Sequence, residues 1–547
     1  MKNWTKKTPV KLYSEYDDVQ EKLAKINGID DLNRFLNPRE SDLHDPRLLD
    51  NIEQACKIIL DAMRTGKKIR IFSDIDADGI TATVVMYNFL KQFGVDVSYF
   101  HVQRSAGHGI EQAMDVVPED TELLIIVDSS TSSAEACREL KEKGIEIIIL
   151  DHHHPECENP YALIVNNQMC DYPNKELSGV GIVWKTVQVL DDYLGSGTAD
   201  EFIDLVAVGL HGDVMSMREP ENRYIVYQGL KNIKNEGLKA ILQANKINLF
   251  DVNSGTIGFT ITPTLNGASR MDKIELALKL LSTDDYFLCA NLAAEAKELN
   301  DRRKLMQADF VKRYSEKIEH ELQHRNIIVL VDDTITSGFT GLVAGDIANK
   351  YRKPTVVLTH AKTKDGEPLF RGSARGYGFN IRGHISQMPQ ALFAAGHDQA
   401  CGVGVLQKNF EEFVKHIGVG VNLEDKGNQY DLELDVQDIT YDLIEKVMEF
   451  NFVTGKGMRE TKFLVRNLVV VGKRQMGGGS TVRIDCNDEK NPFVLMKFRT
   501  NQEFFDSVQD CAESIVAVGS LNLNKWKGKW KTIITPQLFL DDYEVVS

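Results

Sequence analysis

The chain has 547 residues, of which 42% are hydrophobic and 26% are charged, and its formal net charge at pH 7 is −16. At about 100–200 residues per domain, this length predicts three to five domains with well-formed cores. The composition is typical of a globular protein, and no apolar run reaches the roughly 18 residues of a membrane helix. The acidic balance argues mildly against a nucleic-acid partner, but it does not exclude local basic patches.

Eight cysteines are scattered along the chain without a Cys-x-x-Cys pair, which argues against a zinc ribbon or an iron–sulfur cluster. So few unpatterned cysteines in so long a chain are typical of a reducing compartment. The first ten residues, MKNWTKKTPV, lack the apolar core of a signal peptide. We therefore expect a soluble cytoplasmic protein with no membrane partner.

Residues 1–65 are polar and are predicted to form an N-terminal helical region. From there to about residue 280, short apolar strands alternate with helices. The predicted strands are 68–73, 95–102, 123–128 and 145–150, and the predicted helices are 78–93, 132–143 and most of 178–245. Continuously apolar strands separated by helices indicate a parallel sheet covered on both faces. The sequence thus predicts an α/β domain over residues 66–280.

The residue pattern changes twice in the second half of the chain. Residues 281–325 contain a long polar run without Gly or Pro, which predicts a connecting helix. NIIVLVDD and PTVVLTH then predict a second α/β domain over residues 326–420. Residues 425–547 read as short strands separated by turns, which indicates a small β-barrel.

Acidic side chains follow the first predicted strand closely. Asp74, Asp76 and Asp78 alternate in SDIDADG, so an extended backbone would point all three the same way. Crowded like charges are costly unless a cation neutralises them, and a divalent metal with oxygen ligands would do so. The alternative is a helix N-cap in an acidic loop, because Asp favours the first turn.

Three further segments supply ligand-type residues. Asp128 closes the third strand, ILDHHHPE places Asp151, His152 and His153 at the end of the fourth, and Asp213 follows an apolar helix. Imidazole is a good ligand for Mn²⁺-like ions and can donate to phosphate. Either Asp128 or Asp213 alone would be a helix cap in most proteins. Together, at the carboxyl ends of parallel strands, these residues predict a metal site.

The order Asp-x-Asp-x-Asp-Gly, strand-terminal Asp, Asp-His-His and Gly-Asp resembles the four motifs of the DHH phosphoesterases. Further segments resemble the RecJ exonucleases within that superfamily, including the DHHA1 domain and the C-terminal OB fold. They are SGVGIVWK (178–185), PTLNGASRM (263–271), FRGSARGYGFN (370–380), AAGHDQACGVGV (394–405) and VAVGSLNLNKWKGKWK (516–531). Departures from the usual RecJ pattern, such as Ser73 and Ala395, mark a divergent member. The resemblance implies a DHH catalytic domain at 66–280, a DHHA1 substrate-binding domain at 326–420 and an OB fold at 425–547.

The resemblance also implies a two-metal site for Mn²⁺ or Mg²⁺. By position, Asp76 would serve the first ion, Asp78, His152 and Asp213 the second, and Asp128 both. Asp74 and Asp151 would orient ligands, and His153 would contact the scissile phosphate.

The expected substrate side is cationic. Arg270, Arg371 and Arg375 lie in Gly/Ser/Asn-rich segments that could cradle phosphate, and the resemblance adds Ser373 and His397. The alternative is that these are loop arginines paired to surface acids. Weaker candidates of the same kind are Arg104 and His108. Lys525, Trp526, Lys527 and Trp530 interleave lysines with aromatics, which suits base stacking, although lysines also protect edge strands.

The resemblance implies a metal-dependent exonuclease that hydrolyses single-stranded DNA in the 5′-to-3′ direction to 5′-mononucleotides, with a role in DNA repair and recombination. Single-stranded DNA would be its partner, together with a single-strand-binding protein or a helicase. One alternative is a phosphodiesterase for short oligonucleotides or cyclic dinucleotides, but such relatives usually lack an OB domain. A family II pyrophosphatase shares the metal motifs but has no need of the C-terminal region. Another alternative is a non-catalytic single-strand-binding replication scaffold, whose members have lost acidic ligands. The direction of digestion and the preference for DNA over RNA follow only from the resemblance.

Overall fold

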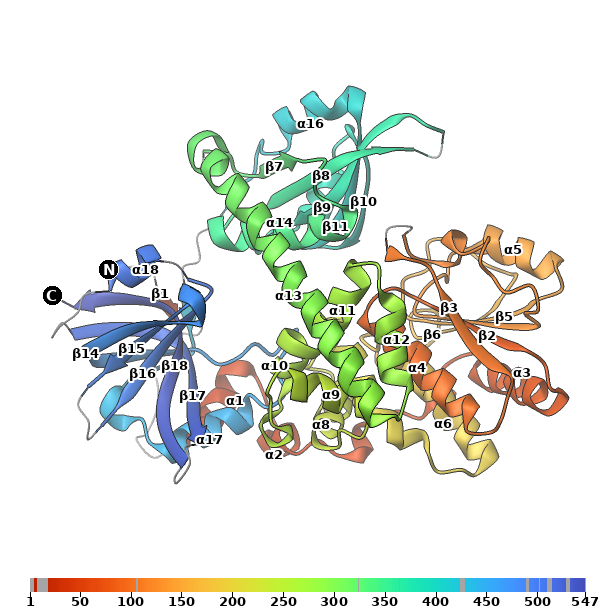
Figure 1. Cartoon of the computed structure of the whole chain (residues 1–547), viewed down its shortest axis with the longest axis horizontal. Coiled ribbons are helices and arrows are strands. Elements are labelled where there is room, and N and C mark those ends of the chain that lie inside the picture. Colours follow the sequence, from red (N-terminus) through yellow and green to blue (C-terminus); the bar gives the residue numbers. More distant parts are fainter. Residues whose placement is uncertain are drawn as a thin grey trace.

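A computed structural model describes residues 4–6, 18–104, 107–322, 324–363, 365–423, 428–487, 491–500, 502–508, 514–527 and 532–546. These residues form two α/β lobes and a C-terminal OB-like sheet (Figure 1). The predicted α/β class is therefore confirmed. The long helix α13 (Tyr286–Lys317) runs from the first lobe to the second, where the sequence predicts a connecting helix.

The first lobe contains a five-stranded, fully parallel sheet with the strand order β3-β2-β4-β5-β6. Its strands are β2 (Ile69–Ser73), β3 (Val97–His101), β4 (Leu123–Val127), β5 (Glu146–Asp151) and β6 (Leu163–Asn166). The helices around it are α3 (Ile52–Thr65), α4 (Ala77–Lys91), α5 (Ala134–Glu142) and α6 (Gly179–Leu194). Every residue of β2 and β4 is buried, as expected for parallel strands covered on both faces.

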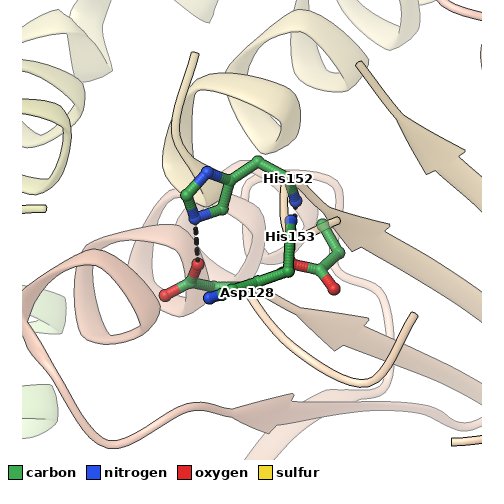
Figure 2. A group of neighbouring side chains, drawn as sticks. Asp128, His152 and His153 are labelled. Atoms are coloured by element: carbon green, nitrogen blue, oxygen red, sulfur yellow. Dashed lines mark hydrogen bonds and ion pairs between the residues drawn. The ribbon is translucent and has the colours of Figure 1, made fainter. Parts of the chain in front are cut away.

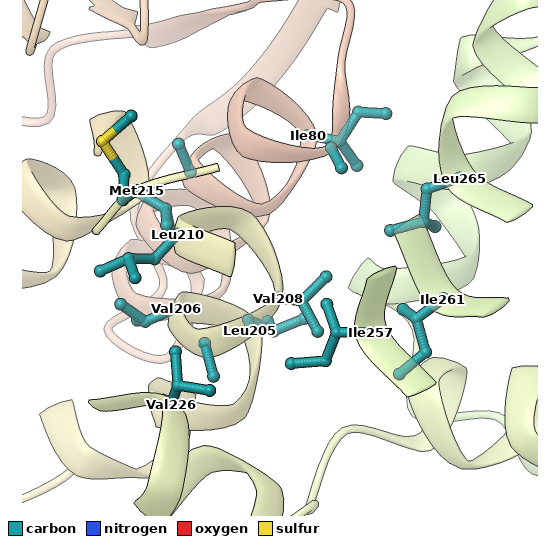
Figure 3. Packing of buried hydrophobic residues seen from close by; sticks show 14 of the residues in the cluster. Ile80, Leu205, Val206, Val208, Leu210, Met215, Val226, Ile257, Ile261 and Leu265 are labelled. Atoms are coloured by element: carbon teal, nitrogen blue, oxygen red, sulfur yellow. The ribbon is translucent and has the colours of Figure 1, made fainter. Parts of the chain in front are cut away.

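A further group of helices packs against α4 and α6 of this lobe. It consists of α7 (Ile203–Gly212), α8 (Pro220–Lys231), α9 (Glu236–Ala244), α10 (Ser254–Thr256), a π-helical turn (Ile257–Ile261), α11 (Thr262–Arg270) and α12 (Ile274–Ser282). Figure 3 shows side chains of α4, α7, α8 and α11 meeting in one apolar core, among them Ile80, Val208, Val226 and Leu265. This core fixes the end of α7, where Asp213 follows.

The second lobe contains a mixed sheet with the order β10-β11-β9-β8-β7, in which only β7 and β8 are parallel. Its strands are β7 (Ile328–Val331), β8 (Thr355–Lys362), β9 (Pro368–Arg375), β10 (Ala391–His397) and β11 (Ala400–Leu406), and its helices are α14 (Ser337–Tyr351), α15 (Ile381–Ser386) and α16 (Phe410–His416).

The Gly-rich segments around Arg371 and His397 are strands of this sheet rather than loops. A Cβ on Gly372 would lie 2.0 Å from the carbonyl oxygen of Val357 on β8, so only glycine permits this pairing. The glycines lower the strand propensity of this segment, but they allow β9 to pack closely against β8.

The C-terminal region contains β12 (Asn428–Tyr430), β13 (Leu432–Asp435), α17 (Tyr441–Phe450), β14 (Phe463–Met476), β15 (Thr481–Cys486), β16 (Phe493–Phe498), α18 (Gln502–Ser507), β17 (Ser514–Lys527) and β18 (Thr532–Val546). Strand pairing runs β14–β15–β16–β18–β17 and returns from β17 to β14, so these five strands form a closed circuit. The Gly-rich stretch 477–479 lies in the β14–β15 connection.

The N-terminal region, expected to be helical, begins with a short strand. β1 (Trp4–Lys6) pairs in parallel with β12, and Trp4 Nε1 donates a hydrogen bond of 3.2 Å to Asp542. After it come α1 (Val19–Asn27), which contacts α17, and α2 (Leu32–Leu36). The sequence spacing of more than 400 residues hides this pairing from local patterns. Within the described residues, no helix combines the length and the apolar character needed to cross a membrane.

Candidate metal centre

Four chain segments bring acidic groups to one edge of the parallel sheet. Asp74 follows β2, Asp128 follows β4, Asp151 ends β5, and Asp213 follows the last residue of α7. Because parallel strands all end at the same edge, side chains distant in sequence meet there. Asp128 has a φ of 59°, a left-handed conformation that turns the chain sharply after β4.

The motif Asp74-Ile75-Asp76-Ala77-Asp78 is not extended, so the prediction of one alternating face is wrong. Helix α4 begins at Ala77, and Asp76 is its N-cap, with its carboxylate accepting from the backbone N–H of Asp78 at 3.0 Å and of Gly79 at 3.3 Å. Asp76 is thus both a helix cap and a candidate ligand. The helix turns Asp78 away from Asp74, and the two lie in different groups of potential ligands.

The carboxylate of Asp78 is fixed by the start of α6. It accepts hydrogen bonds from Ser178 Oγ at 3.0 Å and from the backbone N–H groups of Gly179 at 2.7 Å and Val180 at 3.1 Å. A helix N-terminus stabilises a negative charge placed against it. Gly179 also lets Asp128 approach, because a Cβ there would lie 2.4 Å from Asp128 Oδ1.

His152 lies between two of these carboxylates. Its Nε2 is 3.4 Å from Asp128 Oδ1 and 3.3 Å from Asp213 Oδ2, and Figure 2 shows its ring directed at Asp128. Burial lowers the pKa of His152 to about 4, so the imidazole is neutral at pH 7 and keeps a lone pair for a metal.

Asp151 and His153 form a second kind of contact. Asp151 is fully buried, and its Oδ1 lies 2.7 Å from Nδ1 of His153, while its Oδ2 accepts from Thr131 Oγ1 at 2.6 Å. Although burial acts to lower it, the pKa of His153 is raised to about 9, chiefly by the hydrogen bond and charge of Asp151. Although burial acts to raise it, the pKa of Asp151 is held below its usual range, chiefly by the hydrogen bond and charge of His153. The His153 side chain is 56% exposed.

The remaining carboxylates repel one another. Burial and then the charge of Asp76 raise the pKa of Asp74 to about 7 and of Asp78 to about 6. Burial and the charge of Asp78 raise the pKa of Asp128 and of Asp213 well above the usual value. Such crowding of buried negative charge is what a divalent cation relieves.

Ligand atoms gather in three groups, within each of which they lie within 4.8 Å of one another. The groups are Asp74, Asp76 and Asp128; Asp78, His152 and Asp213; and Asp128, Asp151, His152 and His153. Buried atoms of this set also lack hydrogen-bond partners, namely Asp74 Oδ1, Asp128 Oδ1, His152 Nε2 and Asp213 Oδ2. Unpaired buried oxygens and a neutral imidazole fit Mn²⁺ or Mg²⁺. Asp74, expected only to orient ligands, is thus placed to bind an ion directly.

An arginine cluster adjoins this centre. Arg104 Nη1 donates to the carbonyl oxygen of Ile75 at 3.3 Å, and Arg270 donates to the carbonyl of Gly338 at the start of α14. Burial and then the charges of Arg104, Arg303 and Arg375 lower the pKa of Arg270 to about 9. The positive charges of these arginines repel one another, just as the neighbouring carboxylates do. An anionic ligand would relieve this repulsion.

The second lobe supplies the other expected cationic residues. Arg371, Ser373 and Arg375 alternate on β9, so their side chains share one face of the sheet. Ser373 Oγ lies 3.0 Å from Thr340 Oγ1 on α14. Within the described chain, none of Arg270, Arg371 and Arg375 has a carboxylate within 4.0 Å, so the reading as surface ion pairs gains no support.

His397 and His108 also lie near the centre. The charge of His153 contributes to lowering the pKa of each, after burial in both cases and, for His397, after Lys456. The C-terminal candidates are less defined. Lys525 is exposed on β17, the side chains of Trp526 and Lys527 are not described, and Trp530 lies outside the described residues.

Two cations near the centre were missed in the sequence. Arg303 lies on α13, where its Nε donates to Asn300 Oδ1 at 3.0 Å, and nothing in that polar helix distinguishes it beforehand. Lys456 lies between α17 and β14, in a Gly-Lys-Gly triplet that could have drawn attention as a turn holding a charge.

Comparison with known proteins identifies the chain. A model of the DHH family N-terminal domain matches residues 68–210, and a model of the RecJ OB domain matches residues 430–541. The single-stranded-DNA-specific exonuclease RecJ of Haemophilus influenzae is 31% identical over 408 residues, which cover 68% of this chain and 69% of that protein. The chain belongs to the RecJ family. RecJ of Bacillus subtilis is 30% identical over 531 residues, covering 93% of this chain but only 65% of that longer protein.

Solved structures of the RecJ family share this fold. RecJ from Thermus thermophilus in complex with Mn²⁺ matches with a TM-score of 0.76 and 24% identity, over 96% of this chain and 75% of that one. The two lobes, connecting helix and OB-like sheet described above are therefore the RecJ arrangement. The resemblance drawn from the sequence motifs is confirmed, and so is a centre suited to Mn²⁺ or Mg²⁺.

Proposed function

We propose that this chain is a metal-dependent exonuclease that hydrolyses single-stranded DNA from the 5′ end to 5′-mononucleotides. One observation carries the proposal. The carbonyl oxygen of Ile75, between Asp74 and Asp76, accepts hydrogen bonds from both Arg104 and Ser269, the residue before Arg270. A backbone group of the carboxylate motif therefore joins the metal-type cluster to the phosphate-type cluster. A phosphodiester strand needs both side by side.

The metal ligands in this proposal are Asp74, Asp76, Asp78, Asp128, His152 and Asp213. When bound, Mn²⁺ or Mg²⁺ activates a water for attack on phosphorus and stabilises the developing charge. Asp76 holds its carboxylate in place by capping α4, and Asp78 does so through the N-terminus of α6. Both ligands are therefore positioned before an ion arrives, which reduces the cost of binding.

His153 acts on the substrate side. Its Nδ1–H donates to Asp151, so in the protonated ring Nε2–H is left to donate to a phosphate oxygen. Asp151 keeps the ring oriented and charged at neutral pH, which is a positioning role. Arg104, Arg270, Arg371, Arg375, Ser373 and His397 would hold the phosphates of the 5′-terminal nucleotides. Lys525, Trp526, Lys527 and Trp530 would contact the strand at a distance from the centre.

The other candidate functions gain less support. A phosphodiesterase for short oligonucleotides or cyclic dinucleotides has no need of a RecJ OB domain, which residues 430–541 match. A binding scaffold without activity has no need of several buried carboxylates whose oxygens lack partners, because that arrangement costs stability.

The cellular setting follows from the same proposal. We place the protein in the cytoplasm, acting on single strands that arise in DNA repair and recombination. A single-strand-binding protein or a helicase would present the strand to it.

A direct assay tests the proposal. The protein is incubated with single-stranded DNA and RNA labelled at either end, with Mn²⁺, Mg²⁺ or EDTA. Mononucleotides released first from the 5′ label of DNA, only with metal, are the expected result. Hydrolysis that persists in EDTA, or release that begins at the 3′ label, would contradict it.

A further inference from the structure

Residues 451–460, here called the docking loop, connect α17 to β14 but pack against the catalytic lobe. His211 Nε2 donates to the carbonyl oxygen of Thr454 at 2.9 Å, and the N–H of Met217 donates to the carbonyl oxygen of Lys456 at 2.8 Å. Ser216 and Lys456 form an isolated parallel β-bridge. The docking loop therefore runs alongside the segment that begins with Asp213.

Glycines on either side of Lys456 allow this close approach. Gly455 and Gly457 have φ values of 157° and 79°, which disfavour other residues. A Cβ on Gly455 would lie 2.9 Å from Met217 Cγ and 3.4 Å from His211 Nε2. The two glycines thus allow the backbone of Lys456 to lie close to the segment that follows Asp213.

Two arginines of the catalytic lobe hold the docking loop at its ends. Arg223 Nη1 donates to the carbonyl oxygen of Val453 at 2.8 Å, and Arg218 Nε donates to that of Gly457 at 3.0 Å. The same guanidinium groups reach the N-terminal helices, through the carbonyl oxygens of Phe35 and Asn27. The docking loop is consequently fixed to the catalytic lobe.

The Lys456 side chain forms an ion pair with Glu176. Its Nζ lies 2.8 Å from Glu176 Oε2, and the side chain is 47% exposed. Its charge lowers the pKa of His397, second only to burial, and offsets part of the rise that burial and Asp78 cause at Asp213. The N–H of Ser216, the bridge partner of Lys456, donates to the same Glu176 oxygen at 3.2 Å, so Lys456 and Glu176 both lie beside the segment that follows Asp213.

We propose that Lys456 is a substrate-positioning residue that leaves Glu176 to bind a phosphate of the DNA strand beside the metal ligands. This inference rests on the proposed function and adds to it a ligand from the C-terminal region. The exchange is favourable because a half-exposed Lys–Glu pair is weak. A charge-assisted contact to phosphate is stronger and releases counterions from the strand.

The test measures strand binding without catalysis. A 5′-phosphorylated oligodeoxynucleotide with a 3′ fluorophore is titrated in EDTA, and its anisotropy is followed over a range of KCl concentrations. The variants are Lys456→Met, Lys456→Arg and Glu176→Gln. Lys408→Met is the matched control, because Lys408 forms a comparable exposed pair with Glu367 at 2.7 Å in the second lobe, away from the centre. Melting temperatures and kcat/KM with Mn²⁺ are measured for each variant.

We expect Lys456→Met to weaken binding on the order of tenfold, the effect of one charged hydrogen bond, and to reduce the slope of log affinity against log salt by about 0.7. Lys456→Arg should restore both. Glu176→Gln should bind at least as tightly as the wild type, because it frees the ammonium group, and Lys408→Met should behave as the wild type.

The inference is overturned if Lys456→Met keeps wild-type affinity and salt slope. It is also overturned if Glu176→Gln weakens binding as much as Lys456→Met, since the pair would then only hold the docking loop in place. Neither outcome depends on hydrolysis. A wild-type protein that binds the strand but fails to cleave it with Mn²⁺ would instead overturn the proposed function.

Discussion

His153 is held by a buried carboxylate: its Nδ1 lies 2.7 Å from Oδ1 of Asp151, a side chain with no exposed surface. The acceptor is itself fixed by Thr131, whose hydroxyl and N–H both bind Asp151 Oδ2. The relationship determines which ring nitrogen of His153 is available to substrate.

Replacing Asp151 with Asn should therefore reduce kcat about 10- to 100-fold, the usual range for a residue that orients a ligand. The neutral amide no longer stabilises a protonated His153, so the alkaline limb of the pH–rate profile should move to lower pH. In the wild type the pKa of His153 is raised to about 9, and in the variant it should fall toward its ordinary value. An NMR titration of His153 checks this, and an unchanged titration would contradict the assigned role.

Asp128→Asn should make the metal-free protein more stable and should abolish its stabilisation by Mn²⁺. In the absence of metal, burial and the charges of Asp78, Asp76 and Asp74 make ionised Asp128 unfavourable. The amide removes that repulsion, so we expect the melting temperature in EDTA to rise by a few degrees, as about 1 kcal/mol would give. Mn²⁺ should no longer raise it. A variant that melts lower in EDTA and still responds to Mn²⁺ would refute the ligand assignment.

Gly179→Ala tests the close approach at the start of α6. Its Cβ would lie 2.4 Å from Asp128 Oδ1, so Asp128 must move. We expect Mn²⁺ affinity, measured by calorimetry, to fall at least about tenfold, with a stability cost of about 1–3 kcal/mol for overpacking. Gly472→Ala is the control, because a Cβ there meets nothing within 4 Å. Equal metal affinity in both variants would contradict the prediction.

The stabilisation by metal should depend on pH. The pKa values of Asp74 and Asp78 are raised to about 7 and about 6 by burial and by Asp76, so the folded metal-free protein holds protons that the unfolded chain releases. Its free energy of unfolding should therefore fall as pH rises from about 4 to about 7. Bound Mn²⁺ keeps these groups ionised and removes the decline. Thermal melts at pH 5 to 8 should show a gap between Mn²⁺ and EDTA that widens with pH, and a constant gap would refute this account.

The sequence predicted those parts of the molecule that local chemistry determines. The apolar runs of β2, β4 and β5 predicted a parallel sheet, and the acids at their ends predicted where the metal ligands would meet. The conformation of Asp76 and Asp78 was predicted wrongly, because alternation fits an extended segment as well as a helix start. Only the N-cap contact of Asp76 distinguishes the two.

Long-range contacts could not be predicted from one sequence. β9 looked like a loop because its glycines serve close packing against β8, which no local pattern reveals. Lys456 follows Asp213 by more than 240 residues, and its place beside the centre depends on the pairing with Ser216. The strand β1 likewise gains its partner from the far end of the chain.

The contacts of Arg223 indicate where the chain can be truncated. Its buried guanidinium donates to the carbonyl oxygens of Phe35, 188 residues earlier, and of Val453, 230 residues later. Its central carbon, Cζ, also lies 3.5 Å from the centroid of the Phe35 ring. A truncation that ends near residue 425 removes Val453 and leaves the buried Arg223 guanidinium with an unpaired donor. A truncation that ends just after residue 460 keeps the carbonyl oxygens of both Phe35 and Val453. We therefore expect a fragment that contains both lobes to need some 35 residues beyond the end of the second lobe, and the shorter version should be recovered mainly as aggregate.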